Sequence, residues 1–262
     1  MDLYLKDRVA IIGGSSKGLG KACAYKLACE GANIVLCAND YDSLCRTESE
    51  IRLLGVDVLP LMVNMSSKND NEFIVNETIK KFGKIDILVN NSGGPKPGAF
   101  FDINEEDWAK AFEDVLLYAV RMINLVAPYM KENNWGRIVN LTSLTVKEPA
   151  PSLILSNVFR TGVVAMARSL SKELIRHNIT INNICPGAFK TERAIELMQV
   201  AADKQNKSIE EIENNAISKM PLGRYQHPNE LGDLVAFLSS ELAKGITGTT
   251  IQIDGGIFNG LL

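Results

Sequence analysis

The sequence predicts an α/β fold in which a parallel, doubly wound sheet is covered by helices on both faces. Three observations lead to this prediction. Short runs rich in β-branched residues alternate with longer amphipathic stretches along the whole chain. A glycine-rich turn, residues 13–20, follows the first of these runs. The composition, with 46% hydrophobic and 23% charged residues among 262, is that of an ordinary globular protein.

Seven runs have the character of strands, and helical patterns separate them. Strands joined by helices run parallel, and right-handed crossovers wind such a sheet outward in two directions. The ligand site of this kind of sheet lies beyond the carboxyl ends of its strands, so functional residues are expected just after strands. The predicted strands are Arg8–Ile12, Asn33–Cys37, Val56–Val63, Ile85–Val89, Arg137–Leu141, Thr180–Cys185 and Thr249–Ile253.

Charge, cysteine content and chain organisation exclude several classes of protein. The formal net charge of −3 provides no basic surplus for binding nucleic acid or an anionic membrane. No apolar run approaches the roughly 18 residues of a membrane helix, and the N-terminus runs directly into a predicted strand, so we expect a cytoplasmic protein. The five cysteines include no Cys-x-x-Cys pair, which predicts buried free thiols and no metal site. No linker or repeat divides the chain, and we expect one domain over residues 1–262.

The glycine-rich turn is the first candidate for a binding site. Gly14, Gly18 and Gly20 allow the backbone to turn tightly and to approach a pyrophosphate closely. The helical pattern Lys21–Glu30 follows, and a helix N-terminus offers unpaired N–H groups to phosphates. The position of this turn after the first strand of a βαβ unit favours a nucleotide cofactor over a simple connecting turn.

Several motifs in the same order resemble those of the short-chain dehydrogenase/reductase family, and more specifically of 3-oxoacyl-acyl-carrier-protein reductases. The resemblance covers nearly the whole chain. It rests on the glycine turn, on Asn90–Gly93 after the fourth strand, on Gly136–Ser143 at the fifth, on Asn182-x-x-x-Pro186-Gly187 with Thr191 after the sixth, and on Ile246–Gly248 through Asp254–Gly256.

The resemblance implies a single Rossmann-type domain with strand order 3-2-1-4-5-6-7, bound NADP or NAD, and a small-molecule carbonyl or alcohol substrate. It also implies a homotetramer or homodimer built on helices 104–133 and 153–175, and a substrate lid over residues 188–218. The cofactor-binding residues that it implies are Gly14, Ser16, Lys17, Gly18, Leu19, Gly20, Asn39, Asn64, Asn91, Ser92, Gly93, Arg160, Pro186, Gly187 and Thr191.

The family's catalytic group is a Ser, a Tyr with a Lys four residues later, and an Asn on the preceding long helix. The serine corresponds to Ser143, but Ser156 stands at the tyrosine position, Arg160 at the lysine position and Val115 at the asparagine position. The chain resembles a divergent group with Ser-Asn-x-x-Arg in place of Tyr-x-x-x-Lys. Its other departures are Gly13 for Thr, Asn64 for Asp and Ser92 for Ala.

Three interpretations of Ser156 and Arg160 remain open from the sequence. In the first, Ser143, Ser156 and Arg160 form an altered catalytic site, in which the hydroxyls orient a carbonyl, Arg160 stabilises negative charge, and water completes the proton path. In the second, the protein binds nucleotide without catalysis, as a sensor or scaffold. In the third, the pair is a small helix residue and a solvated charge. The favoured function is an NAD(P)-dependent carbonyl reductase.

Further residues bear on the cofactor and the substrate. Lys17 resembles the basic residue that faces the 2′-phosphate in NADP enzymes, whereas Asn39 stands where these enzymes commonly carry Arg, so NADP is only weakly preferred. Lys147 and Glu148 follow Ser143 and could supply a proton through water. Arg193, in the lid, could reach an acidic substrate group.

Overall fold

The structure is a computed structural model and describes residues 2–261. Its seven strands form one parallel sheet in the order β3-β2-β1-β4-β5-β6-β7, as predicted. Each strand lies within two residues of its predicted bounds. The strands are β1 (Val9–Gly13), β2 (Asn33–Ala38), β3 (Val58–Met62), β4 (Ile87–Asn90), β5 (Gly136–Leu141), β6 (Ile179–Pro186) and β7 (Thr250–Ile253).

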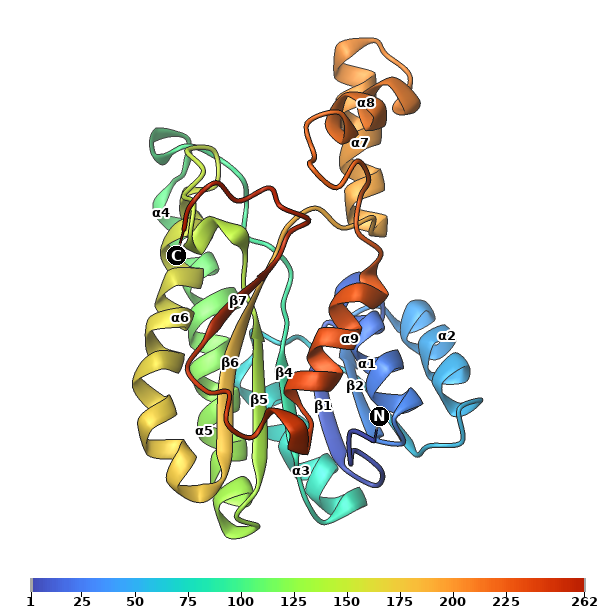
Figure 1. Ribbon diagram of the computed structural model, residues 1–262, viewed down its shortest axis with the longest axis vertical. Helices are drawn as coiled ribbons and strands as arrows, with labels where there is room; N and C mark the ends of the chain where they lie inside the picture. The colour runs from blue at the N-terminus through green and yellow to red at the C-terminus, as the bar shows by residue number, and fades with distance from the viewer. Residues whose placement is uncertain (1, 262) are drawn as a thin grey trace.

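Helices cover both faces of the sheet (Figure 1). Apolar side chains of α1 (Gly18–Cys29), α2 (Tyr41–Arg52) and α9 (Pro228–Leu238) form the core on one face. The other face is covered by α3 (Lys68–Phe82), α5 (Tyr118–Glu132) and α6 (Ile154–Leu174). Burial of both faces explains why the strands read as continuous apolar runs.

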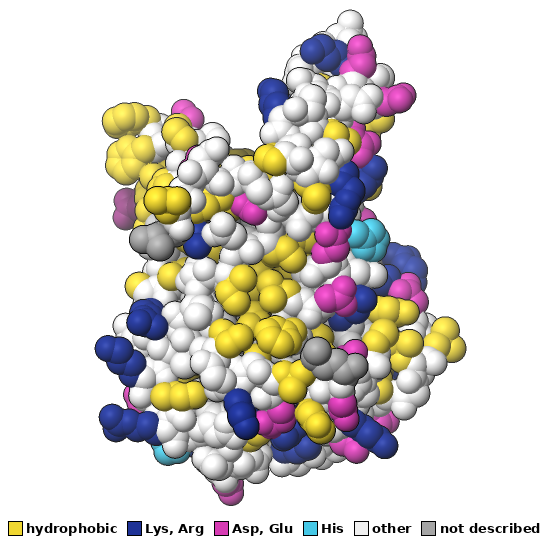
Figure 2. Space-filling model, viewed as in Figure 1, with side chains coloured by type: hydrophobic (Ala, Val, Ile, Leu, Met, Phe, Trp, Pro, Cys, Tyr) yellow, Lys and Arg dark blue, Asp and Glu magenta, His cyan; other side chains and the backbone are white. Residues whose placement is uncertain are grey.

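Two further helices project from this body as an arm, drawn in orange in Figure 1. They are α7 (Glu192–Gln205) and α8 (Ile209–Ile217), and they fall within the predicted lid, residues 188–218. Figure 2 shows a hollow between this arm and the opposite rim of the molecule. None of the helices in residues 2–261 is long and apolar enough to cross a membrane.

The structure corrects three details of the sequence analysis. Helix α1 begins at Gly18 and not at Lys21, because Lys17 is extended and the Lys21 N–H already bonds to the Lys17 carbonyl. The predicted helix 104–133 is divided into α4 (Glu105–Ala111), a π-helical turn and α5. All cysteines described are free, but Cys29 is exposed and Cys45 half-buried, because both lie toward the solvent side of their helices.

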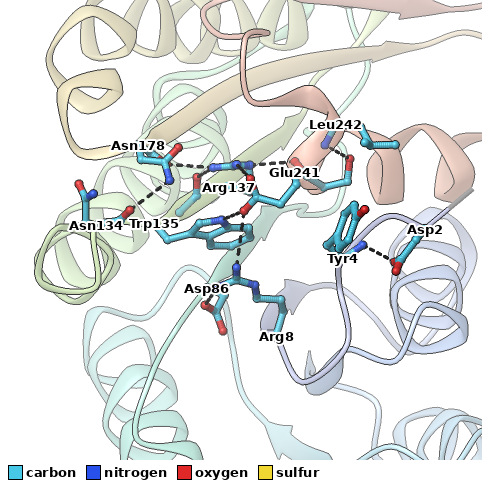
Figure 3. A network of polar contacts seen from close by, with 12 residues as sticks. Asp2, Tyr4, Arg8, Asp86, Asn134, Trp135, Arg137, Asn178, Glu241 and Leu242 are labelled. Carbon is cyan, nitrogen blue, oxygen red and sulfur yellow. Dashed lines mark hydrogen bonds and ion pairs between the residues drawn. The ribbon is translucent and has the colours of Figure 1, made fainter.

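A polar network joins the amino ends of the central strands (Figure 3). The indole of Trp135 lies between two guanidinium groups, with Arg8 3.7 Å and Arg137 4.4 Å from the ring centre. Arg137 is fully buried and donates to the carbonyls of Ser240 and Asn178. This network stabilises the end of the sheet that lies opposite to the candidate site.

Candidate active site

The glycine turn has the geometry that close approach of a ligand requires. Gly14 and Gly18 both have φ of 55°, in the left-handed region that favours glycine. A Cβ at Gly20 would lie 2.2 Å from the Gly14 carbonyl oxygen, so no side chain fits there. The turn therefore exposes backbone at the N-terminus of α1, where phosphate groups are stabilised by N–H donors.

Beside this turn lies a cleft of about 260 Å³ between the carboxyl ends of β1, β2, β3 and β4. It brings together six of the residues that the sequence assigned to the cofactor: Gly14, Ser16, Asn39, Asn64, Ser92 and Gly93. A Cβ at Gly93 would meet no protein atom within 4 Å, so this wall is open backbone. The exposed backbone, the open wall and the polar lining fit an NAD(P) dinucleotide.

Other predicted cofactor residues support the cleft without lining it. The Asn91 amide donates to the Gly13 carbonyl at 3.0 Å and so ties β4 to the glycine turn. The Thr191 hydroxyl caps α7 by accepting from the Ala194 N–H at 3.2 Å, and its methyl group faces Gly18. The remaining three are Leu19, which packs against the core, Pro186, which ends β6, and Gly187, where a Cβ would lie 2.6 Å from Asp254 Cα.

Lys17 has a carboxylate partner that the sequence analysis did not consider. Its Nζ lies 2.7 Å from Asp40 Oδ2, at the start of α2. Lys17, together with the Ser43 N–H, lowers the pKa of Asp40 to about 2, and Asp40 raises the pKa of Lys17. Both side chains are largely exposed, so the pair can separate when another anion competes for the ammonium group.

The two serines that the sequence analysis predicted to be catalytic are linked by a third hydroxyl residue. Ser143, at the end of β5, accepts from the Thr145 backbone N–H at 3.2 Å. Ser156 is buried on the first turn of α6, and its hydroxyl lies 3.0 Å from that of Thr145. The 3-10 turn Leu144–Val146 therefore holds Ser143 and Ser156 in one hydrogen-bonded group.

Arg160 lies one helical turn after Ser156 and is not a solvated charge. Its Nη1 donates to the carbonyls of Leu141 at 2.9 Å and Thr142 at 2.6 Å, at the carboxyl end of β5. Burial lowers the pKa of the guanidinium to about 10, so the group remains charged at neutral pH. The third interpretation of this pair is thus wrong for Arg160.

At the family's asparagine position, Val115 lies in the π-helical turn Phe112–Leu117. Such turns are rare and frequently occur at functional sites. Val115 lines a small cavity together with Arg160 and Tyr118. Gly13 has no room for a side chain, because a Cβ there would lie 2.5 Å from both the Tyr118 hydroxyl oxygen and the Asn91 carbonyl oxygen.

Charged residues at the rim have partners of their own. Lys147 donates to the Gln252 side chain at 2.7 Å, and Arg193 pairs with Glu196 at 3.3 Å on the exposed surface of α7. No group of three or more His, Cys, Asp or Glu that could hold a metal ion occurs within residues 2–261.

Sequence reasoning missed Thr145 and Tyr118. Thr145 is two residues after Ser143, but only the 3-10 turn brings its hydroxyl to Ser156. Tyr118 looks like an ordinary core residue of an apolar helix, and no sequence signal distinguishes it. Asn90 begins the Asn90–Gly93 motif after the fourth strand, and this position is the signal that places it at the same cavity as Arg160.

Comparison with known proteins places these features in a family. Residues 14–258 match the family model described as enoyl-(acyl carrier protein) reductase. The 3-oxoacyl-[acyl-carrier-protein] reductase FabG of Thermotoga maritima is 30% identical over 97% of this chain and 99% of its own length. The chain belongs to the short-chain dehydrogenase/reductase family. Membership makes it an NAD(P)-dependent oxidoreductase of the carbonyl-reducing type.

Two further members of the family are similar over their whole lengths. The NADPH-dependent reductase BacG of Bacillus subtilis is 30% identical over 96% of this chain and 98% of its own. The solved structure of L-sorbose reductase from Gluconobacter frateurii, complexed with NADPH and L-sorbose, superimposes with a TM-score of 0.96 at 29% identity and covers 100% of both chains.

Proposed function

We propose that the protein reduces the carbonyl group of a 3-oxoacyl-type compound or another small ketone with NADPH, through an altered catalytic site. The observation that supports this most is the placement of Arg160. Its half-buried, charged guanidinium is fixed to the end of β5, one turn after Ser156 on the same helix. A developing alkoxide is stabilised by a fixed positive charge, and Arg160 provides one near the serines at the carboxyl end of the sheet.

The cofactor, when bound, supplies a hydride to the carbonyl carbon. Gly14, Ser16, Asn39, Asn64 and Gly93 would hold its adenosine side, because they line the cleft beside the glycine turn. The preference for NADPH over NADH depends on Lys17, whose ammonium group can leave Asp40 and bind a 2′-phosphate. The ammonium group favours NADPH because this extra phosphate is an anion. The names of relatives such as BacG and the NADPH complex of L-sorbose reductase support the same preference.

The side chains at the end of β5 have separate roles in this proposal. Ser143 donates a hydrogen bond to the substrate oxygen, and Arg160 stabilises the charge that develops on it. Arg160 itself gives no proton at neutral pH, because a pKa of about 10 keeps it protonated. Ser156 is turned toward Thr145, so it orients the hydroxyl group and the water that delivers the proton.

The alternative is a nucleotide-binding protein without redox activity. The organised group of Ser143, Thr145 and Ser156 favours the enzyme, since loss of catalysis would remove the reason to keep buried hydroxyls paired at this end of the sheet. The arm formed by α7 and α8 serves as the substrate lid in this proposal.

We also propose that the protein is a cytoplasmic dimer or tetramer. Val158 on α6 is 44% exposed, and Phe112, whose ring packs against that of Phe159 on the same helix, is 41% exposed. Figure 2 shows a second group of hydrophobic side chains over β7 and α9, where β7 leaves the edge of the sheet open. Surfaces of both kinds are typical of contacts between copies of a chain. Light scattering at micromolar concentration tests this, and a monomer would contradict it.

The activity is tested by following NADPH consumption with a panel of 3-oxoacyl thioesters, diketones and aldehydes. Arg160→Ala should lower kcat by about 100- to 1,000-fold, the usual effect of removing a preorganised donor to an oxyanion. Ser156→Ala should lower kcat much less, because another water can partly replace the hydroxyl. An equal or larger loss for Ser156→Ala would show that this serine transfers the proton directly. Absence of turnover by the wild type on every substrate, with NADPH still bound, would favour the non-catalytic alternative.

A further inference from the structure

A small cavity, lined in part by Arg160, lies between the carboxyl ends of β4 and β5 and the helices α5 and α6. Its volume is about 10 Å³, which is room for about one water molecule. The polar residues that line it are Asn90, Ser92, Tyr118, Asn140, Thr142 and Arg160. The family's asparagine position contributes only the apolar Val115 to this lining.

Two of these side chains carry a buried oxygen with no hydrogen-bond partner among the described residues, Asn90 Oδ1 and Tyr118 Oη. Asn90 is 4% and Tyr118 2% exposed, so bulk water does not serve them. A buried polar atom without a partner destabilises the folded state, and native structures contain few of them. Two such atoms on the wall of one cavity indicate a shared partner inside it.

The orientation of Asn90 is fixed by its neighbours. Its Nδ2 donates to Asn140 Oδ1 at 2.8 Å, and Asn140 Nδ2 donates in turn to Asn183 Oδ1 at 3.0 Å. Asn183 completes the row by donating to the Thr249 carbonyl. Because every amide nitrogen in this row has an acceptor, Asn90 Oδ1 must accept from a donor that the row does not contain.

The backbone carbonyls that bind Arg160 use only part of its hydrogen-bonding capacity. A guanidinium has five N–H bonds, and the two on Nη1 are directed at the Leu141 and Thr142 carbonyls. The described residues offer no acceptor to the three N–H bonds on Nε and Nη2. Arg160 is half-buried, and it lines the cavity, so these N–H bonds can donate to a water molecule held there.

We propose that this cavity binds one structural water molecule, which accepts from Arg160, donates to Asn90 Oδ1 and exchanges a hydrogen bond with the Tyr118 hydroxyl. Three partners are typical of a buried water. Tyr118 is then a positioning residue, since it acts on the guanidinium through the water and does not contact the substrate. Ser156 stands at the family's tyrosine position, and Tyr118 does not replace that tyrosine as an acid. Tyr118 instead helps to hold Arg160, through the water, in its position.

The Tyr118 hydroxyl lies in a crowded place near the glycine turn. A Cβ at Gly13 would lie 2.5 Å from the Tyr118 hydroxyl oxygen and 2.5 Å from the Asn91 carbonyl oxygen, so the hydroxyl lies close to the glycine turn. The consequence for Arg160 rests on the function proposed above, whereas the water can be tested without substrate or cofactor.

Tyr118→Phe is the decisive variant, because it removes only the hydroxyl group. If the water is present, the variant loses a satisfied hydrogen bond, and we expect the melting temperature of the ligand-free protein to fall by about 2–4 °C. If the hydroxyl is unpartnered, its removal relieves a penalty and the melting temperature rises. Tyr129→Phe, on the same helix but away from the cavity, is the matched control and should leave the melting temperature unchanged.

A crystal structure of the ligand-free protein at about 1.5 Å supplies the second readout. We expect a water peak within hydrogen-bond distance of Asn90 Oδ1, Tyr118 Oη and Arg160 in the wild type, and none in Tyr118→Phe. NADPH should bind the variant about two- to tenfold more weakly, because Arg160 is less well held. A rise in melting temperature, an absent peak in the wild type, or a water that persists unchanged in the variant would overturn the proposal. Failure of NADPH to bind the wild type would contradict the proposed function and leave the water intact.

Discussion

Gly93→Val is predicted to weaken NADPH binding without destabilising the protein. Gly93 lies in the loop after β4 and lines the cleft beside the glycine turn. A Cβ at this position has no protein atom within 4 Å, and the backbone is not in the left-handed region. The added side chain therefore enters open space, and the free energy of unfolding should change by less than about 0.5 kcal/mol.

The same open space is where the cofactor is proposed to bind. Ligand atoms packed on the Gly93 backbone would lie about 3.5–4 Å from it, so the valine methyl groups would overlap with them. Overpacking of this kind costs about 1–3 kcal/mol. The Kd for NADPH should accordingly rise about 5- to 150-fold.

Nicotinamide fluorescence measures the Kd, and thermal unfolding of the ligand-free protein measures stability. Gly245→Val is the matched control, because a Cβ there also meets nothing within 4 Å, but Gly245 lies between the turn Glu241–Ala243 and β7. Equal Kd values for the two variants would refute the assignment of the cleft to the cofactor. A lower melting temperature for Gly93→Val alone would show that the reasoning about open space is wrong.

Three other outcomes follow from contacts described above. The kcat should fall as the pH rises through about 10, because Arg160 is cationic below its pKa and loses that charge above it; a pH–rate profile that is flat to pH 11 would contradict this. Asp40→Asn should tighten NADPH binding a few-fold more than NADH binding, because Lys17 loses its competing partner, and parallel titrations of both cofactors measure this. Arg137→Met should lower the free energy of unfolding by on the order of 3 kcal/mol in denaturant titration, with kcat per folded molecule unchanged; a selective loss of kcat would show that the two ends of the sheet are coupled.

The fold was predictable because it depends on periodic patterns. Alternating apolar runs and amphipathic stretches determine which segments are strands and helices, and the glycine turn follows from residues that tolerate φ of 55°. The positions of Ser156 and Arg160 followed from their spacing after Ser143. These inferences need only local sequence and one family pattern.

The contacts inside the site were not predictable in the same way. Thr145 meets Ser156 only because a 3-10 turn folds back toward α6. Tyr118 reaches the glycine turn because a π-helical turn precedes α5 and changes which residues of the long helix face the sheet. The Lys17–Asp40 pair depends on the side-chain directions of two loops. Each of these contacts is a property of three-dimensional packing and leaves no periodic signal.

The stacked arrangement of Trp135 between Arg8 and Arg137 has a consequence for how this protein can change over evolutionary time. It joins segments that precede β1, β4, β5 and β6, so four strands are anchored at the end remote from catalysis (Figure 3). Substitutions at the other end then act on a sheet whose assembly does not depend on them. A lineage can exchange a phenol and an ammonium group for a hydroxyl and a guanidinium and still inherit a folded scaffold on which new chemistry can be selected. Libraries that randomise only the loops after the strands should therefore retain an unusually high proportion of folded members.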